Sequence, residues 1–454
     1  MKINLPTGLR GDSGTPKQYE SLINCYLEQG QINTLSPRPG ITLLFDRYAF
    51  TRGQGVFQDQ ITFETAIYSV EADRLYKTTI DENGVITREE IGAIDGSENC
   101  LLIPSFTHLL IQRIGAGAYS WDGETFKEID SVNYEPCIWA TFTDGHYVFT
   151  PAEGGPIFWS NGYDPNDIDA ANFSDAERKP DRNYAAEVWR GNLIVFGGET
   201  IERQSYNANA NAYQTGTLDN IGFVGGLVRF GNDLMFIGRP VNGTFSMYVY
   251  ADGGSQRISN KAVDEVLNLY SFDELNESRA DFFSWRGEDQ AVWHLPNHTL
   301  HFYGDFAFIK SGVNGKVTGN WQGQFITSYQ GRLIVGDRDS SNAGVLSEDF
   351  NDYGEIIEAE ANTYVRGEPR SNFKVTRLTA SVTTGQTNDD QRIELSITED
   401  GVHYGESDSV QFQGIGIFND EISWQPIGMY DNYMGSKLRW VGDIKVPIDG
   451  VYYV

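Results

Sequence analysis

The most regular feature of the sequence is a repeat in which a glycine-containing polar turn precedes or splits a short apolar run. The clearest copies are WRGNLIVFG at 189–197, RFGNDLMFIG at 229–238 and YQGRLIVGD at 329–337, with weaker copies at 143–150 and 285–295. The turn glycines of these copies are Gly145, Gly191, Gly231, Gly287 and Gly331.

Successive copies of this turn therefore lie 40 to 56 residues apart. Strand–turn–strand content with such a period is typical of propeller blades, because a small sheet must have neighbours on both sides to bury its faces. We predict an all-β fold with a β-propeller of six or seven blades over residues 51–370. A generic multi-stranded sandwich with accidental spacing is the alternative.

The two ends of the chain have a different texture. Residues 1–50 carry several prolines and glycines and few alternating apolar runs, so we predict an extended N-terminal arm. From residue 371 onward, short segments such as QRIELSITED alternate polar and apolar residues with period two. Half-buried antiparallel strands have this pattern, so we predict a C-terminal β-sandwich over residues 371–454.

One segment breaks the strand rhythm. In residues 258–275 the apolar side chains fall on one helical face, and Ser271 with Glu274 fits a capping box. We predict a helix here that packs on a blade or between blades.

Composition and charge narrow the class of protein. Hydrophobic residues make up 40% of the 454-residue chain and charged residues 21%, as in globular proteins. The net charge of −29 disfavours tight binding to nucleic-acid phosphates. No apolar run approaches the ~20 residues that cross a bilayer, so we expect no membrane-spanning segment. Three cysteines, an odd number, favour folding in a reducing compartment over a disulfide framework.

Three histidines raise the question of a metal site. His294, His298 and His301 lie close together in a predicted hairpin, and zinc sites use closely spaced histidines. Neither a cysteine nor an acidic ligand accompanies them locally. We favour ordinary strand histidines and expect neither a metal nor another cofactor.

Two acidic segments loosely resemble calcium loops, but neither keeps the EF-hand register, and the same residue types are common in surface turns. A Thr398–Gly401 turn followed by Tyr404 resembles the Asp-Gly hairpins of sialidase-like propellers, where the aspartate has a structural role. Neither a catalytic serine elbow nor a phosphate-binding glycine loop is present, so we predict that the chain is not an enzyme. The residues of the two acidic segments are Asp164, Asn166, Asp167 and Asp169, and Asp337, Asp339, Ser341 and Asn342.

Residues 156–202 form the most specific pattern in the chain. This stretch resembles the packaged-DNA stabilisation family of short-tailed phages, also called the tail hub or nozzle family. The opening of the chain, with Arg38-Pro39-Gly40, and the segment around Arg257 fit the same family. The residues that carry the resemblance are Phe158, Asp164, Pro165, Glu177, Pro180, Asp181, Trp189, Gly191 and Glu202.

The resemblance implies a structural protein of the virion tail that is made in the host cytoplasm. It implies a homohexameric ring below the portal adaptor, where the ring would retain packaged DNA and later serve as the conduit for genome ejection. A tail needle or plug and tailspikes or fibres would be its other partners. Double-stranded DNA would pass through the lumen without specific binding, which agrees with the acidic composition.

Two other functions remain open at this stage. A glycan-degrading propeller enzyme would require convergent carboxylates in a pocket. A receptor-binding module would require exposed aromatic platforms. For the tail hub we further hypothesise that the arm and the sandwich make most contacts with partners, so that a chain lacking residues 1–40 stays folded.

Overall fold

The computed structural model describes most of the chain and is built almost entirely of strands. Its helices are α1 (Lys261–Leu267) and α2 (Phe272–Asn276), and neither of these described helices is long and apolar enough to cross a membrane. The described residues are 2–3, 6–11, 19–28, 33–60, 62–174, 181–313, 316–366, 372–384, 391–401, 403–412, 420–425, 428–431, 433–448 and 451–453.

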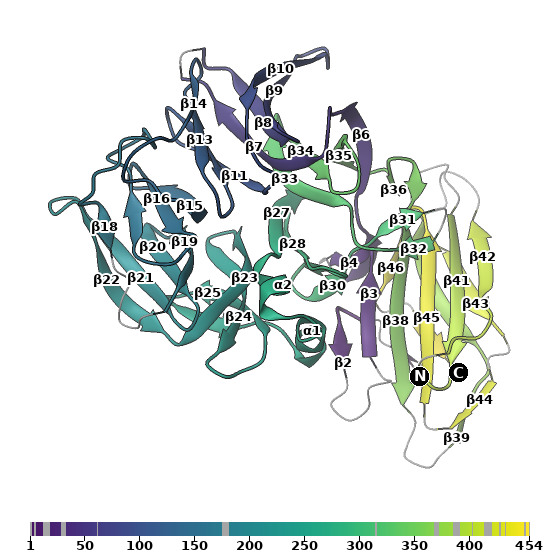
Figure 1. The fold of residues 1–454 in the computed structure, drawn as a ribbon. Helices are drawn as coiled ribbons and strands as arrows, with labels where there is room; N and C mark the ends of the chain where they lie inside the picture. The colour runs from purple at the N-terminus through teal and green to yellow at the C-terminus, as the bar shows by residue number, and fades with distance from the viewer. Residues whose placement is uncertain are drawn as a thin grey trace.

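Seven antiparallel four-stranded blades follow one another through the described residues and form a closed propeller (Figure 1). The first strand of each blade is the innermost, and β33 of the last blade lies against β7 of the first. The prediction of an all-β propeller with six or seven blades is thus confirmed, with seven blades.

The blades are numbered here in chain order. Blade 1 consists of β7 (Thr51–Gln58), β8 (Thr65–Glu71), β9 (Arg74–Ile80) and β10 (Ile86–Ala93); blade 2 of β11 (Cys100–Pro104), β12 (Leu109–Arg113), β13 (Ala118–Trp121) and β14 (Phe126–Glu128); blade 3 of β15 (Cys137–Thr143), β16 (His146–Pro151), β17 (Ile157–Trp159) and β18 (Phe173–Ser174); blade 4 of β19 (Asn183–Trp189), β20 (Asn192–Gly197), β21 (Ile201–Asn207) and β22 (Ala212–Asp219). Blade 5 consists of β23 (Ile221–Phe230), β24 (Asp233–Pro240), β25 (Ser246–Ala251) and β26 (Gly254–Arg257); blade 6 of β27 (Arg279–Trp285), β28 (Glu288–His294), β29 (Thr299–Phe302) and β30 (Phe306–Phe308); blade 7 of β33 (Gly323–Tyr329), β34 (Arg332–Asp337), β35 (Asn342–Ser347) and β6 (Gly40–Asp46).

The glycine repeat marks the hairpin between the first two strands of blades 3 to 7. In blade 4, for example, Arg190 and Gly191 both have positive φ, 46° and 73°, as a two-residue type I′ turn requires. Blades 3, 6 and 7 have the same pair of positive angles at the equivalent positions. The widest spacing in the repeat falls between blades 5 and 6, because α1 and α2 are inserted there.

The two helices pack on the propeller at this insertion. The side chain of Asn260 caps α1, and Ser271 and Glu274 form the predicted capping box of α2. Val263 and Leu267 of α1 are fully buried in a core shared with blades 5 and 6. The backbone of α2 lies so close to Gly225 that a β-carbon there would sit 2.0 Å from the Leu275 oxygen.

A strand from the N-terminal region closes the propeller. Strand β6 pairs antiparallel with β35 and so supplies the outermost strand of blade 7, more than 270 residues before the other three. Ile41 of β6 is completely buried against Val335 and Leu346. Because β6 leads directly into β7 of blade 1, its hydrogen bonds to β35 join the first and last blades. Short strands flank blade 7: β31 (Ser311–Val313), β32 (Lys316–Thr318), β36 (Asn351–Asp352) and β37 (Glu355–Ile356).

A two-sheet sandwich lies beside the propeller, on the right in Figure 1, and confirms the predicted C-terminal sandwich. One sheet runs on from blade 6 through β3 to β38, β45, β41 and β42, and the other joins β1, β47, β40, β46, β5 and β4. The strands are β1 (Lys2–Ile3), β2 (Arg10–Gly11), β3 (Tyr19–Ile23), β4 (Cys25–Glu28), β5 (Thr34–Pro37), β38 (Glu358–Arg366), β39 (Asn372–Val375), β40 (Leu378–Thr384), β41 (Gln391–Thr398), β42 (Asp408–Phe412), β43 (Asp420–Trp424), β44 (Gly428–Asp431), β45 (Tyr433–Val441), β46 (Ile444–Pro447) and β47 (Val451–Tyr453).

The N-terminal arm before β6 belongs to this sandwich. Strand β3 pairs with β38, and the β4–β5 hairpin pairs with β46, so both sheets contain arm strands. Leu22, Cys25 and Leu35 of the arm are buried in the sandwich core. This corrects the premise that the arm is free for partners: a chain without residues 1–40 would leave that core open. The boundaries at residues 50 and 370 stay predictions, and strand pairing crosses both.

Candidate functional site

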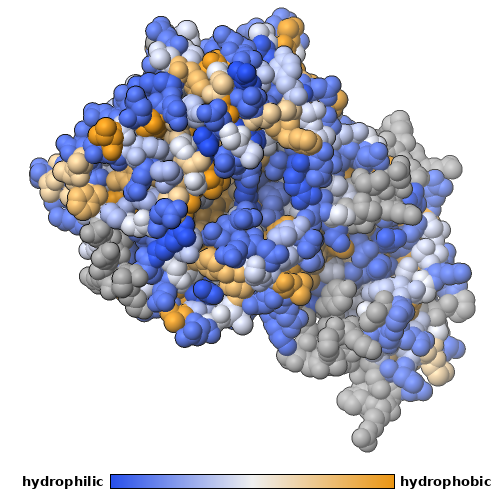
Figure 2. All heavy atoms as spheres, viewed as in Figure 1, coloured by the Kyte–Doolittle hydropathy of each residue, from blue (hydrophilic) through white to orange (hydrophobic). Residues whose placement is uncertain are grey.

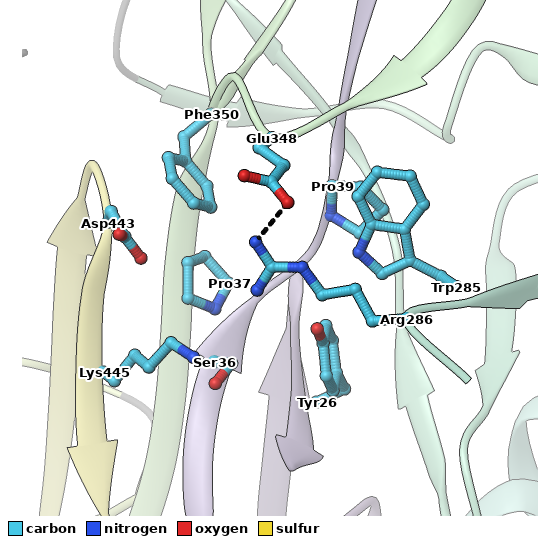
Figure 3. A pocket seen from close by; sticks show the side chains of 10 residues that line it. All are labelled: Tyr26, Ser36, Pro37, Pro39, Trp285, Arg286, Glu348, Phe350, Asp443 and Lys445. Carbon is cyan, nitrogen blue, oxygen red and sulfur yellow. Dashed lines mark ion pairs between the residues drawn. The ribbon is translucent and has the colours of Figure 1, made fainter. Parts of the chain in front are cut away.

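Three parts of the chain meet where the arm passes between the propeller and the sandwich. Figure 3 shows side chains from the arm, from blade 6, from the segment after blade 7 and from the sandwich that surround a small pocket. Its free volume is about 10 Å³, roughly the space of one water molecule. The junction is therefore a packed joint between structural units and is too small for an organic ligand. The lining residues are Tyr26, Ser36, Pro37, Pro39, Trp285, Arg286, Glu348, Phe350, Asp443 and Lys445.

Arg38 lies at the centre of this junction and is 1% exposed. Its guanidinium donates to both carboxylate oxygens of Asp352, at 3.0 and 2.5 Å. The other donated bonds go to the Pro39 and Lys310 carbonyls, both at 2.9 Å, and to the Asn24 side-chain oxygen at 3.1 Å. All five N–H groups thus have acceptors, which is the condition for burying a guanidinium without a large penalty.

Asn24 connects the same elements from the other side. Its φ of 56° is a left-handed conformation that asparagine tolerates better than most residues. Its side-chain oxygen accepts from the Lys310 amide at 2.7 Å, and its side-chain nitrogen donates to the Glu358 carbonyl at 3.0 Å. Asn24 of the arm therefore connects the segment after blade 6 with strand β38 of the sandwich.

Ion pairs add to the junction at its solvent-facing side. Arg286, in the first turn of blade 6, pairs with Glu348 beyond blade 7 at 2.8 Å (Figure 3). Lys445 of the sandwich pairs with Glu28 of the arm at 2.7 Å. Burial alone would raise the pKa of Glu28, but the Lys445 and Ser36 hydrogen bonds outweigh it and lower this pKa. Such partly exposed pairs contribute little energy, so they set the geometry of the joint more than its strength.

The three histidines are separate and each has its own partner. The Nε2 atom of His294 lies 2.9 Å from Asp281, the Nδ1 atom of His298 lies 2.5 Å from the Tyr270 hydroxyl, and the Nε2 atom of His301 lies 2.8 Å from Gln290. Within the ranges that the structure describes, three or more His, Cys, Asp or Glu side chains are nowhere gathered as metal ligands. The cysteines Cys25, Cys100 and Cys137 are buried and unpaired.

In both acidic segments, aspartate carboxylates accept hydrogen bonds from nearby backbone amides and so close turns. The Asp337 carboxylate accepts from the Asp339 and Ser340 amides at 2.7 and 2.9 Å. In the other segment, Asp164 accepts from the Asn166 amide at 2.9 Å, and Asp169 accepts from the Ala171 amide at 2.9 Å. The Thr398 hydroxyl likewise accepts from the Gly401 amide at 3.0 Å and closes its hairpin.

Those residues of the family resemblance that the structure describes are spread over blades 3 and 4 rather than gathered in one site. Phe158 stacks on Phe149 in the core, with ring centroids 5.1 Å apart. Asp181 accepts from the Glu199 and Thr200 amides at 2.7 and 2.9 Å and so joins the start of blade 4 to its second turn.

Trp189 donates from Nε1 to Asp233 of blade 5 at 3.2 Å, and Gly191 occupies the left-handed turn beside it. Pro165 and Glu202 are buried. Glu177 and Pro180 lie outside the described residues. Sequence reasoning missed Asp352 and Asn24 as partners of Arg38, although Arg38-Pro39-Gly40 was part of the resemblance.

Comparisons with known proteins cover almost the whole chain. The family model described as the beta-propeller of bacteriophage P22 Gp10 matches residues 26–351, and the model of the beta-sandwich of the same protein matches residues 363–452. The tail hub protein gp10 of Salmonella phage P22 is 22% identical over 442 residues, which cover 91% of this chain and 89% of that relative.

Two solved structures align with most of the chain at low sequence identity. The N-terminal domain of Nup159 superposes with a TM-score of 0.44 at 8% identity and covers 72% of this chain and 99% of its own. Virginiamycin B lyase from Staphylococcus aureus superposes with a TM-score of 0.40 at 10% identity and covers 67% of this chain and 97% of its own.

Proposed function

The chain belongs to the bacteriophage P22 Gp10 family, and from this premise we propose that it is a structural hub protein of a short phage tail. The observation that carries the proposal is that both family domains match in order along one chain. The relative named as a tail hub protein aligns over 91% of that chain. We assign the protein no enzymatic activity, and the residues Phe158, Asp164, Pro165, Glu177, Pro180, Asp181, Trp189, Gly191 and Glu202 act in this proposal as structural residues.

Several copies would form a ring, which we propose to be a hexamer, below the adaptor of the portal. The ring would retain packaged DNA in the capsid and form the conduit for its ejection, with a needle or plug and tailspikes or fibres as further partners. The net charge of −29 per copy supports this use, since a carboxylate-rich surface repels phosphates and lets a duplex slide.

The junction of the arm, the propeller and the sandwich also supports a mechanical role. A subunit that holds pressurised DNA must not open between its parts. The arm strands and the Arg38–Asp352 pair tie the propeller to the sandwich through buried backbone and side-chain bonds. We propose that these bonds keep the propeller and the sandwich in a fixed relative position while partners pull on either.

Disruption of the gene in the source phage tests the proposal. Particles assembled without this protein should package DNA and then lose it, so that nuclease-protected DNA per capsid falls towards zero. Supplying the intact chain from a plasmid should restore protection, and supplying a chain with Asp352→Asn should restore it poorly. Mutant particles that retain DNA and remain infectious would contradict the hub function.

A further inference from the structure

Two connected cavities lie along the axis of the propeller on the face that carries α2. Figure 2 shows a hollow in the middle of the propeller with both hydrophilic and hydrophobic residues around it. The cavities have volumes of about 590 and 460 Å³, and they share Asn99, Glu277, Ser278 and Arg279 in their walls. This size is in the range of small-molecule sites.

Arginines from three successive blades line the larger cavity. Arg279 begins the innermost strand of blade 6, Arg338 follows β34 of blade 7, and Arg52 is near the start of the innermost strand of blade 1. Arginine is the residue that best matches the geometry of carboxylate and phosphate groups. Such an arc is unexpected in a chain whose net charge is −29.

Arg279 is held in place without a contacting counter-ion. Its guanidinium carbon lies 3.4 Å from the centroid of the Phe325 ring. The neighbouring Asp281 carboxylate acts on Arg279 electrostatically from beyond 4.0 Å. Its own contacts are the Phe325 and Ile326 amides at 3.2 and 3.1 Å and His294 at 2.9 Å. The Nη1 atom of Arg279 is buried and has no hydrogen-bond partner among the described residues.

Arg52 also lines the cavity and, like Arg279, has no contacting counter-ion among the described residues. It is 8% exposed, and its Nη1 and Nη2 atoms donate to the backbone carbonyls of Glu98 and Ile94 at 2.8 and 3.4 Å. Within the described part of the chain, neither Arg52 nor Arg279 forms an ion pair within 4.0 Å, whereas Arg338 pairs with Asp339 at 3.1 Å. Two pre-oriented guanidiniums without paired carboxylates are costly to bury unless something else supplies the negative charge.

The acidic groups around the cavity do not supply that charge in contact. Glu274 bonds Ser271 in its capping box, and Glu98, in the smaller cavity, pairs with Arg113 at 3.3 Å. Glu277 is exposed at the end of α2 and forms no ion pair among the described residues. It adds a negative charge to the rim and would repel an approaching anion.

We propose that this axial cavity binds an oxyanion, a carboxylate or phosphate group, between Arg279 and Arg52, with Arg338 at the rim. The same chemistry is offered by a free anion in solution and by an acidic side chain of another protein. The site is separate from the junction of arm and sandwich, and the inference stands independently of the tail-hub proposal.

Isothermal titration calorimetry of the full chain, in a buffer that contains neither phosphate nor carboxylate ions, tests this inference. The probes are inorganic phosphate and a blocked tetra-glutamate peptide. We expect saturable binding of one molecule per chain for at least one probe. Tighter binding of phosphate would indicate a free anion as the natural ligand, and tighter binding of the peptide would indicate a protein carboxylate.

Variants connect the binding to the proposed residues. Arg279→Gln and Arg52→Gln should each weaken it by about tenfold or more, because each removes charge-assisted hydrogen bonds. Glu277→Gln should strengthen it about twofold or more, since a repelling charge is lost. The control is Arg74→Gln, a 41% exposed arginine of blade 1 outside the cavity, which should change nothing.

Two results would overturn the inference. One is the absence of saturable binding of both probes to the folded wild-type chain. The other is binding that Arg279→Gln and Arg52→Gln leave unchanged. If either variant fails to fold, Arg338→Gln and Glu277→Gln at the accessible rim still decide the matter, because Arg338→Gln should weaken binding and Glu277→Gln should strengthen it.

Discussion

A buried ion pair holds together two parts of the chain that are far apart in the sequence. Arg38 and Asp352 lie 314 positions apart in the sequence, yet their side chains are 1% and 0% exposed and form a bidentate pair. A buried pair of this kind is not a large source of net stability, but losing one partner leaves an uncompensated charge in the interior. The pair therefore fixes the register between the arm and the propeller.

Breaking this pair should destabilise the protein strongly. We expect Arg38→Met or Asp352→Asn to lower the free energy of unfolding by about 3–5 kcal/mol, whereas Arg74→Met, at an exposed pair, should cost about 0–1 kcal/mol. Urea denaturation followed by tryptophan fluorescence measures both. Equal effects for the buried and the exposed pair would show that the junction does not depend on Arg38.

The buried His301 predicts a specific dependence on pH. Burial, with the nearby Arg38 charge, lowers its pKa from 6.5 to about 3 in the folded protein. The unfolded chain therefore binds a proton below pH 6.5 that the folded chain does not, and stability falls as the pH drops from about 6.5 towards 3.

The variant His301→Gln keeps a hydrogen bond to Gln290 within reach and removes this titration. Between pH 6 and pH 4, the free energy of unfolding of the wild type should fall more steeply than that of the variant, by up to about 1.4 kcal/mol per pH unit. Denaturation curves at several pH values measure the difference. Parallel pH profiles would mean that His301 is not held neutral.

At the scale of elements, the blades were predictable and the arm was not. The hairpins of blades 3, 4, 6 and 7 recur because a type I′ turn requires two left-handed residues, and a glycine marks each of these turns and the turn of blade 5 in the sequence. The arm strands are short, and their partners are remote: Ser21 pairs with Asn362, for example. Local pattern carries no information on such pairing, so residues 1–50 looked like a free extension.

The candidate site was only partly predictable for the same reason. The histidine and aspartate segments could be judged as turns and strand positions from local chemistry. The Arg38 junction could not be found, because it joins the arm, the link after blade 6 and the segment after blade 7. The arginines of the axial cavity come from blades 1, 6 and 7 and share no motif.

Truncation separates the roles of the arm strands. Removing residues 1–40 should abolish cooperative folding, since it removes β3, β4 and β5 from both sheets of the sandwich together with Arg38. Removing residues 1–18 keeps these strands, so the chain should still unfold in one cooperative transition at lower stability. Circular dichroism with thermal unfolding checks both. A cooperatively folded chain without residues 1–40 would contradict the structural role of the arm.

At the scale of the whole molecule, the closed seven-bladed propeller and the sandwich form one continuous unit, because strands of the N-terminal arm belong to both. The family supplies the context of a phage tail hub, and the fold holds the propeller and the sandwich in fixed relative positions.

Immunogold electron microscopy of particles from the source phage tests the central claim most directly, with antibody raised against this chain. The account predicts label confined to the short tail at the portal vertex, and none on particles from a gene-disrupted lysate. Label on distal fibres, or on no part of intact particles, would contradict the tail hub function and favour a receptor-binding or glycan-degrading protein.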